Sequence, residues 1–226
     1  MPRVLRIGHR GAAGHAPENT LAAIERGIVL GADFVEIDVR RTSDGVLVAL
    51  HDSTIGRTTD GKGRVSGLSL HELRAFHAGN GERIPTVEEV LTTAAGRAGV
   101  MLELKVAGIA DLIVQAVEKA AFPNRVIYAS FLHDELPRIQ ATPPDAVLMA
   151  LFDRLPRAGV NHAVACGAAY VGLRHDRISR RLVEAFHHEN ILVCVYTPNS
   201  REEIDRALSL GVDGVISDFP ERITGH

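Results

Sequence analysis

Two acidic residues interrupt an apolar segment with a spacing that could bind a metal ion. Residues 35–39 read Val-Glu-Ile-Asp-Val. Because successive side chains of a β-strand point to opposite faces, Glu36 and Asp38 would share one face and the three apolar residues the other. Two carboxylates held side by side away from water repel each other, and a cation between them removes that cost. Carboxylate oxygens suit hard cations such as Ca²⁺ or Mg²⁺.

A later apolar segment repeats this arrangement. Residues 101–105 read Met-Leu-Glu-Leu-Lys, which places Glu103 and Lys105 on one strand face and two leucines on the other. Glu103 would be a third oxygen ligand, and Lys105 a positive charge beside it. An inward Glu–Lys ion pair without a metal is the alternative. Acids on two strands favour the metal site, so we predict one divalent ion, Ca²⁺ or Mg²⁺, held by Glu36, Asp38 and Glu103.

Two histidines are expected at the same place. The first apolar run ends in Ile-Gly-His-Arg-Gly, which sets His9 and Arg10 at the end of a strand. Residues 39–50 predict a hairpin closed by a two-residue turn at Asp44-Gly45, a register that puts Asp38 opposite His51.

Histidines beside a cation suit general acid and general base roles at neutral pH. Arg10 and Lys105 would supply the fixed positive charge that a transferring phosphoryl group needs. The constellation predicts metal-assisted cleavage of a phosphate ester.

The positioning elements follow from hydrophobic patterning. Short apolar runs alternate with amphipathic segments along the whole chain, which predicts an α/β fold of the (β/α)8 TIM-barrel type. An open doubly wound sheet is the alternative, but its Gly-x-Gly-x-x-Gly signature is missing after the first strand. The expected strands are Val4–Gly8, Phe34–Val39, Val100–Leu104, Val126–Ser130, Ala146–Phe152, Ala168–Leu173, Ile191–Thr197 and Gly214–Ser217.

Helices are expected between several of these strands. Thr86 with Glu89 three residues later predicts a capped helix start. We expect one domain over residues 1–226, in which residues 53–84 form an insertion after the second strand that covers the C-terminal mouth and carries a short helix at Ser69–His77. The other expected helices are Asn19–Leu30, Thr86–Ala95, Ala110–Ala121, Ser179–Glu189 and Ser200–Leu210.

Composition limits the classes of partner. The 226 residues carry a net charge of −3, which gives no broad basic surface for nucleic acid or anionic membrane. No apolar run approaches the roughly 18–20 residues of a membrane span, and the N-terminus lacks the apolar segment of a signal peptide. Cys166 and Cys194 are expected to be buried free thiols in a reducing compartment. We therefore expect a cytoplasmic protein whose partner is a small molecule; its oligomeric state is not predicted.

Several segments, taken in order, resemble the glycerophosphodiester phosphodiesterase family. They are GHRGAAGHAPENT, VEIDVRRTSDGVLVALHD, RTTDGKGRV, MLELK and DGVISDFP, and together they span most of the chain. The resemblance implies a (β/α)8 barrel with an insertion over its mouth and one divalent ion. It also implies hydrolysis of glycerophosphodiesters to sn-glycerol 3-phosphate and an alcohol.

The resemblance assigns roles to particular residues. It implies an acid–base pair of His9 and His51, phosphate binding by Arg10 and Lys105, and metal ligation by Glu36, Asp38 and Glu103.

Glu18 and Asn19 match the family's Pro-Glu-Asn-Thr, although a helix start with Asn19 near the cap is an equal alternative. The family's seventh strand commonly ends in Val-Trp-Thr-Val-Asn, whereas this chain has Val-Tyr-Thr-Pro-Asn. Tyr196 would then form an aromatic wall beside the substrate, or else be an ordinary residue of the rim.

The expected mechanism has two steps. His9 would deprotonate the glycerol hydroxyl next to the phosphate, His51 would protonate the leaving alkoxide, and water would open the cyclic phosphate that results. Direct attack by water is the alternative route with the same residues. Three other functions stay open: a phosphodiesterase of the lysophospholipase D type, a metal-dependent lyase or isomerase, and a barrel that binds phosphodiesters without cleaving them.

Overall fold

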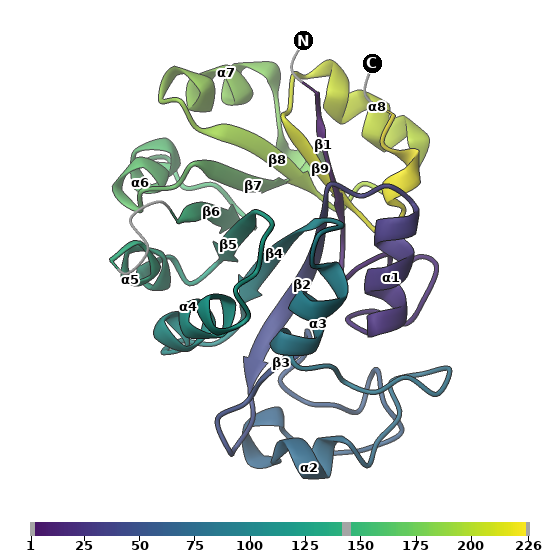
Figure 1. The fold of residues 1–226 in the computed structure, drawn as a ribbon. Coiled ribbons are helices and arrows are strands. Elements are labelled where there is room, and N and C mark those ends of the chain that lie inside the picture. Colours follow the sequence, from purple (N-terminus) through teal and green to yellow (C-terminus); the bar gives the residue numbers. More distant parts are fainter. Residues whose placement is uncertain (1–2, 142–145, 225–226) are drawn as a thin grey trace.

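The chain folds into a closed barrel of parallel strands. The computed structural model describes residues 3–141 and 146–224. Within them eight parallel strands close through the pairing of β1 with β2, in the order β1-β9-β8-β7-β6-β5-β4-β2 (Figure 1). The predicted (β/α)8 barrel is therefore confirmed. The barrel strands are β1 (Leu5–Gly8), β2 (Phe34–Arg41), β4 (Gly99–Leu104), β5 (Val126–Ser130), β6 (Val147–Phe152), β7 (Tyr170–Arg174), β8 (Leu192–Tyr196) and β9 (Gly214–Ser217).

Helices connect the strands and cover the outside of the barrel (Figure 1). The Thr86–Glu89 capping box forms as predicted. Two helices without a sequence prediction, α5 and α6, are short, and α5 has a proline in its first turn. The helices are α1 (Leu21–Val29), α3 (Val87–Ala94), α4 (Ala110–Lys119), α5 (Leu136–Gln140), α6 (Gly159–Ala165), α7 (Arg180–His188) and α8 (Arg201–Ser209), with 3₁₀ turns η2 (His133–Glu135), η3 (His175–Arg177) and η4 (Pro220–Arg222). No described helix is long and apolar enough to cross a membrane.

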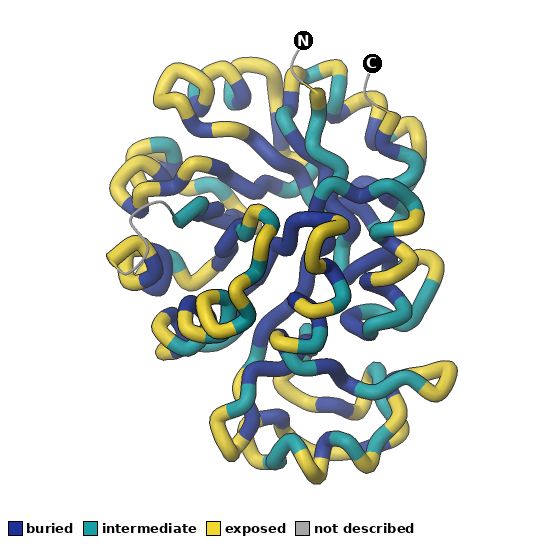
Figure 2. The backbone as a smooth tube through the Cα atoms, in the orientation of Figure 1, coloured by how far each residue is buried: buried dark blue, intermediate teal, exposed yellow. Residues whose placement is uncertain are grey.

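Strand β2 faces two different cores. Val35 and Ile37 belong to the same apolar cluster as Ile24 of α1 and Leu91 of α3, outside the barrel. Phe34 belongs to the cluster inside the barrel. Figure 2 shows that the strands are mostly buried and that the helices are exposed on their outer sides. Because side chains alternate along a strand, residues 36 and 38 point inward with residue 34, as predicted.

The hairpin after β2 differs from its predicted register. Strand β3 (Leu47–Ala49) pairs antiparallel with β2, and Val39 lies opposite Ala49. The turn has three residues, because Gly45 takes a φ of +86° and the N–H of Thr42 donates to the carbonyl of Val46 over 2.9 Å. The predicted pairing of Asp38 with His51 is therefore wrong by one residue.

The inserted residues 53–84 form a small unit beside the ends of β2 and β3 (Figure 1). They contain η1 (Val65–Gly67) and α2 (Leu70–Leu73), which is shorter than the predicted helix Ser69–His77. The insertion and the hairpin share an apolar cluster of their own, made of Val48, Leu50, Ile55, Val65, Leu73, Ala78 and Ile84.

Candidate active site

The three acids that the sequence singles out converge inside the barrel. One oxygen atom from each of Glu36, Asp38 and Glu103 lies within 4.8 Å of the others. Neighbouring parallel strands produce this arrangement, since β2 pairs with β4 in a register that places Asp38 beside Glu103. Glu36 and Asp38 are each 1 % exposed and Glu103 is 9 % exposed. The strand pattern alone therefore predicted a real cluster of buried carboxylates.

One oxygen of this cluster has no partner among the residues that the structure describes. Glu36 Oε2 accepts the backbone N–H of Arg10 over 2.7 Å, whereas Oε1 is buried without a hydrogen bond. Burial and the nearby charge of Asp38 raise the pKa of Glu36 to about 8. A buried carboxylate in this condition is stabilised by a cation, and three carboxylates form an oxygen set that suits Ca²⁺ or Mg²⁺. The residues therefore fit the predicted divalent ion.

The alternative ion pair is also present. Lys105 Nζ lies 2.6 Å from Glu103 Oε1 and 3.4 Å from Asp38 Oδ1. The lysine does not reach Glu36, so it balances only part of the cluster. The ion pair and a divalent ion are compatible, because the lysine contacts only one oxygen of Asp38 and one oxygen of Glu103.

Asp38 is held from several sides. Asn19 Nδ2 donates to Asp38 Oδ2 over 2.8 Å, and Arg10 Nε lies 3.2 Å from the same oxygen. Burial opposes ionisation of Asp38, but the charges of Arg10 and Lys105 outweigh it, so its pKa lies below the usual value. Thr20 is the N-cap of α1, and Asn19 directly precedes it. Asn19 therefore lies near the cap, as the alternative predicts, and its side chain also bonds to Asp38.

His9 lies directly after β1 and is paired with an acid from the other end of the sequence. Its Nδ1 lies 2.7 Å from Asp218 Oδ1, and Asp218 Oδ2 accepts the side-chain amide of Asn199 over 2.7 Å. Burial lowers the pKa of His9, but the hydrogen bond to Asp218 and the charge of Glu36 raise it above its ordinary value. Sequence reasoning missed Asp218, although the motif DGVISDFP contains it.

His51 follows β3 and has an equivalent partner. Its Nδ1 lies 2.7 Å from Asp52 Oδ1. Burial lowers the pKa of His51 below its ordinary value, and the bond to Asp52 offsets only part of this effect. Within the described chain, neither His9 nor His51 makes a hydrogen bond through Nε2, so each ring keeps one nitrogen free for proton transfer.

The predicted phosphate-binding and aromatic residues lie near these groups. Arg10 pairs with Glu18 at 2.7 Å, and both Arg10 and Lys105 contact Asp38. Tyr196, at the end of β8, donates its hydroxyl to the carbonyl of Phe152 over 2.9 Å. The Tyr196 ring meets Phe131 edge-on at 5.9 Å.

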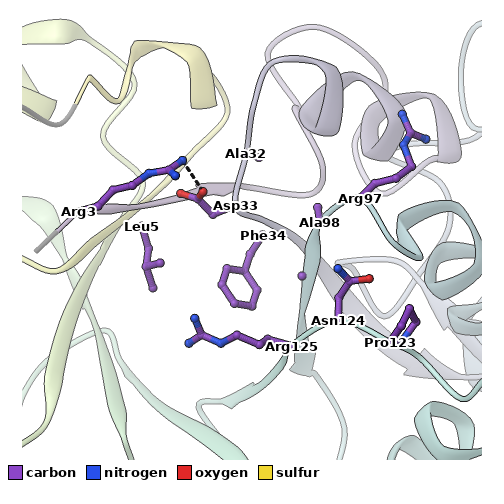
Figure 3. Close-up of a pocket in the computed structure, with 11 residues that line it drawn as sticks. Arg3, Leu5, Ala32, Asp33, Phe34, Arg97, Ala98, Pro123, Asn124 and Arg125 are labelled. Carbon is purple, nitrogen blue, oxygen red and sulfur yellow. Dashed lines mark hydrogen bonds and ion pairs between the residues drawn. The ribbon is translucent and has the colours of Figure 1, made fainter.

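A cavity of about 550 Å³ lies at the opposite, N-terminal end of the barrel (Figure 3). Arg3, Arg97 and Arg125 line it together with Asp33. Arg3 bonds to Asp33 over 2.7 Å, and Arg125 lies over the Phe34 ring at 5.2 Å. None of the predicted site residues lines this cavity.

A (β/α)8 barrel with a carboxylate cluster, two histidine–aspartate pairs and basic side chains is an arrangement suited to metal-assisted hydrolysis of phosphate esters. The model of the glycerophosphoryl diester phosphodiesterase family matches residues 9–222, and the chain belongs to this family. The resemblance seen in the sequence is confirmed.

Relatives and solved structures agree with this assignment. A glycerophosphodiester phosphodiesterase of Caldanaerobacter subterraneus is 33 % identical over 98 % of this chain and 96 % of its own length. One of Bacillus altitudinis is 30 % identical over 96 % and 95 %. An Oleispira antarctica phosphodiesterase, solved with the product sn-glycerol-3-phosphate, is 28 % identical with a TM-score of 0.91, over 98 % of this chain and 95 % of that one.

Proposed function

We propose that the protein hydrolyses glycerophosphodiesters to sn-glycerol 3-phosphate and an alcohol and that it uses one divalent ion. Family membership and the product bound to the Oleispira antarctica relative support the reaction. The observation that carries the metal requirement is the buried, unpartnered Oε1 of Glu36 within a cluster of three carboxylates.

Glu36, Asp38 and Glu103 would hold the ion, either Ca²⁺ or Mg²⁺. When bound, the ion would polarise a phosphate oxygen and the attacking oxygen. Arg10 and Lys105 would bind the phosphate, since both guanidinium and ammonium already lie at the cluster and would stabilise charge that develops on the phosphoryl oxygens.

The two histidines would move protons in opposite directions. A raised pKa makes His9 the stronger proton acceptor, and a lowered pKa makes His51 the stronger donor. This supports His9 as the base that removes the proton of the glycerol hydroxyl and His51 as the acid that protonates the leaving alkoxide. Water would then open the cyclic phosphate with the roles exchanged. Tyr196 would form one wall of the substrate site.

The test is release of glycerol 3-phosphate from glycerophosphocholine and glycerophosphoethanolamine. We expect release with Mg²⁺ or Ca²⁺, none with EDTA, and none from His51→Ala. No release by the metal-loaded wild type from either substrate would refute the proposal. A substrate without the neighbouring hydroxyl separates the routes, because normal turnover would exclude the cyclic phosphate.

One observation favours a second substrate class, the lysophospholipids. Phe131 and Leu132 are each 40 % exposed, and Phe131 contacts Tyr196. An exposed apolar pair at the rim could bind an acyl chain. Turnover that rises with chain length would support this activity, and turnover independent of it would exclude it.

We also propose that residues 53–84 cover the mouth within a single domain, since Arg57 of this segment bonds to Glu18 beside the site. Cys166 and Cys194 are buried and free. These thiols support the proposal of a reducing, cytoplasmic location.

A further inference from the structure

We propose that Arg57 is a positioning residue that holds the phosphate-binding Arg10 and the histidine His51 in one geometry. The inference rests on the proposed function, because it concerns the same site. Arg57 is the first residue of the motif RTTDGKGRV, and the proposed mechanism gives that motif no role.

The guanidinium of Arg57 bridges two carboxylates. It donates to Glu18 from Nη1 over 2.9 Å and from Nη2 over 2.7 Å. It also donates to Asp52 from Nε over 2.7 Å and from Nη2 over 3.3 Å. Because a guanidinium is planar, such paired hydrogen bonds fix the orientation of each bound carboxylate as well as its distance.

Each of the two carboxylates holds a residue of the site. Glu18 Oε1 accepts from Arg10 Nη1 over 2.7 Å, and Asp52 Oδ1 pairs with His51 Nδ1 over 2.7 Å. A single carboxylate therefore connects Arg57 to Arg10, which would bind phosphate, and another connects it to His51, which would transfer protons. These two groups come from separate parts of the chain, because Arg10 follows β1 and His51 follows the hairpin strand β3.

The bridge also solves an electrostatic problem. Glu18 and Asp52 would repel each other if no cation lay between them. This repulsion would separate the segment that follows β1 from the segment that follows β3. The backbone of His51 is already held by the pairing of β3 with β2 and by Arg40, which donates twice to the His51 carbonyl. The direction of the His51 ring depends instead on its bond to Asp52, and the positive charge of Arg57 holds Asp52 against Glu18.

An exposed ion pair without function is the rival interpretation. Arg57 is 47 % exposed, and pairs of that kind contribute little to stability. Exposure also makes Arg57 a good target, since its replacement leaves no cavity in a core. Arg64, exposed in the same insertion and without a described side-chain bond, provides the matched control.

The kinetic test compares Arg57→Ala, Arg57→Lys and Arg64→Ala with wild type, using glycerophosphocholine and saturating Mg²⁺. We expect Arg57→Ala to lose roughly 10- to 100-fold in kcat, the range for partners that orient functional groups. Adding guanidinium at low millimolar concentration should restore part of the lost kcat of Arg57→Ala. The kcat of Arg57→Lys should lie between those of wild type and Arg57→Ala, and the kcat of Arg64→Ala should match that of wild type. Unchanged kcat in Arg57→Ala would overturn the proposal.

A second comparison isolates the route of the effect. In the double variant Glu18→Gln/Asp52→Asn, adding Arg57→Ala should lower the remaining kcat by less than about threefold, because the bridge has already lost its anions. A loss as large as in wild type would show that Arg57 acts elsewhere.

Nitrogen-15 NMR of the histidine rings tests the geometry without activity. At pH 8, wild type should show His51 with the proton on Nδ1, and Arg57→Ala should show a mixture of tautomers. The signal is assigned by its absence in His51→Ala. An unchanged tautomer in Arg57→Ala would overturn the proposal. If wild type releases no glycerol 3-phosphate, the proposed function fails, and this spectrum still decides the role of Arg57.

Discussion

The two ends of the barrel use the same kinds of side chain in opposite surroundings. At the N-terminal end, Arg3 pairs with Asp33 while 68 % exposed (Figure 3). Arg97 pairs with Glu25 while 42 % exposed. At the C-terminal end, Glu36 and Asp38 are almost completely buried. Water screens the first set, so those pairs are weak. Nothing screens the second set, so its charges must be met by protein groups or by a bound cation.

This difference separates a stabilised surface from a functional site. The two N-terminal pairs are complete, since Arg3 has Asp33 and Arg97 has Glu25. The C-terminal cluster is incomplete, because Glu36 Oε1 has no partner among the described residues. Buried groups that lack a partner reduce stability and persist where function requires them. Substitutions at the two ends should therefore differ in their effects on activity and stability.

The largest effect is expected from Glu36→Gln. The variant keeps the size of the side chain but loses a charged ligand, so we expect kcat/KM for glycerophosphocholine to fall by roughly 10²- to 10³-fold. Arg97→Ala at the other end should retain wild-type activity. The contrast would disappear if both variants lost activity to a similar degree.

A smaller loss is expected from Asp218→Asn. The amide can still bond to His9 but cannot stabilise its positive charge, so we expect kcat to fall by roughly 10- to 100-fold. Because Asp218 raises the pKa of His9, the acid limb of the pH profile of kcat/KM should move to lower pH. A limb that stays in place would show that His9 is not the base.

The third prediction concerns the stability of the metal-free protein. Glu36 has a pKa raised from 4.5 to about 8, so it binds a proton more tightly in the folded state than in the unfolded state. Its contribution is present at low pH and is lost as the pH rises toward 8. In EDTA, the thermal unfolding midpoint of wild type should decrease as the pH is raised from 5 to 8. The midpoint of Glu36→Gln should decrease less over the same range. Parallel curves for the two proteins would contradict the assignment.

The smallest effect is expected at the N-terminal end. Arg97→Ala removes an exposed ion pair with Glu25, and we expect the unfolding midpoint to change by no more than about 2 °C. High salt should reduce even this difference. A large loss of stability would mean that the surface pairs are not screened and that the two ends are alike.

The hydrophobic pattern of the sequence predicted those features that depend on the periodic spacing of apolar residues within a strand or helix. The alternation in residues 35–39 predicted which side chains face inward, and strand–helix alternation predicted the barrel. The hairpin register was wrong because it depends on the backbone conformation of Gly45, which composition does not reveal. Helices α5 and α6 are too short to leave a clear periodic signal.

Partners that are distant in sequence were missed for a different reason. His9 and Asp218 lie at opposite ends of the chain and meet only because β1 pairs with β9. Asn19 contacts Asp38 through a loop whose path no periodicity describes. Arg57 reaches Glu18 and Asp52 from within the insertion. Such contacts depend on barrel closure and loop conformation, which single-sequence reasoning does not supply.

The most direct test of the central claim is the thermal unfolding midpoint of wild type and Glu36→Gln at pH 8, each with EDTA and with saturating Mg²⁺ or Ca²⁺. We predict that the ion raises the wild-type midpoint by about 5 to 10 °C, since binding to the folded state stabilises it. Glu36→Gln should lose most of this rise and, in EDTA, unfold at a higher temperature than wild type. An equal response of the two proteins to the ion would contradict the claim that the buried carboxylates at the C-terminal end form the cation site.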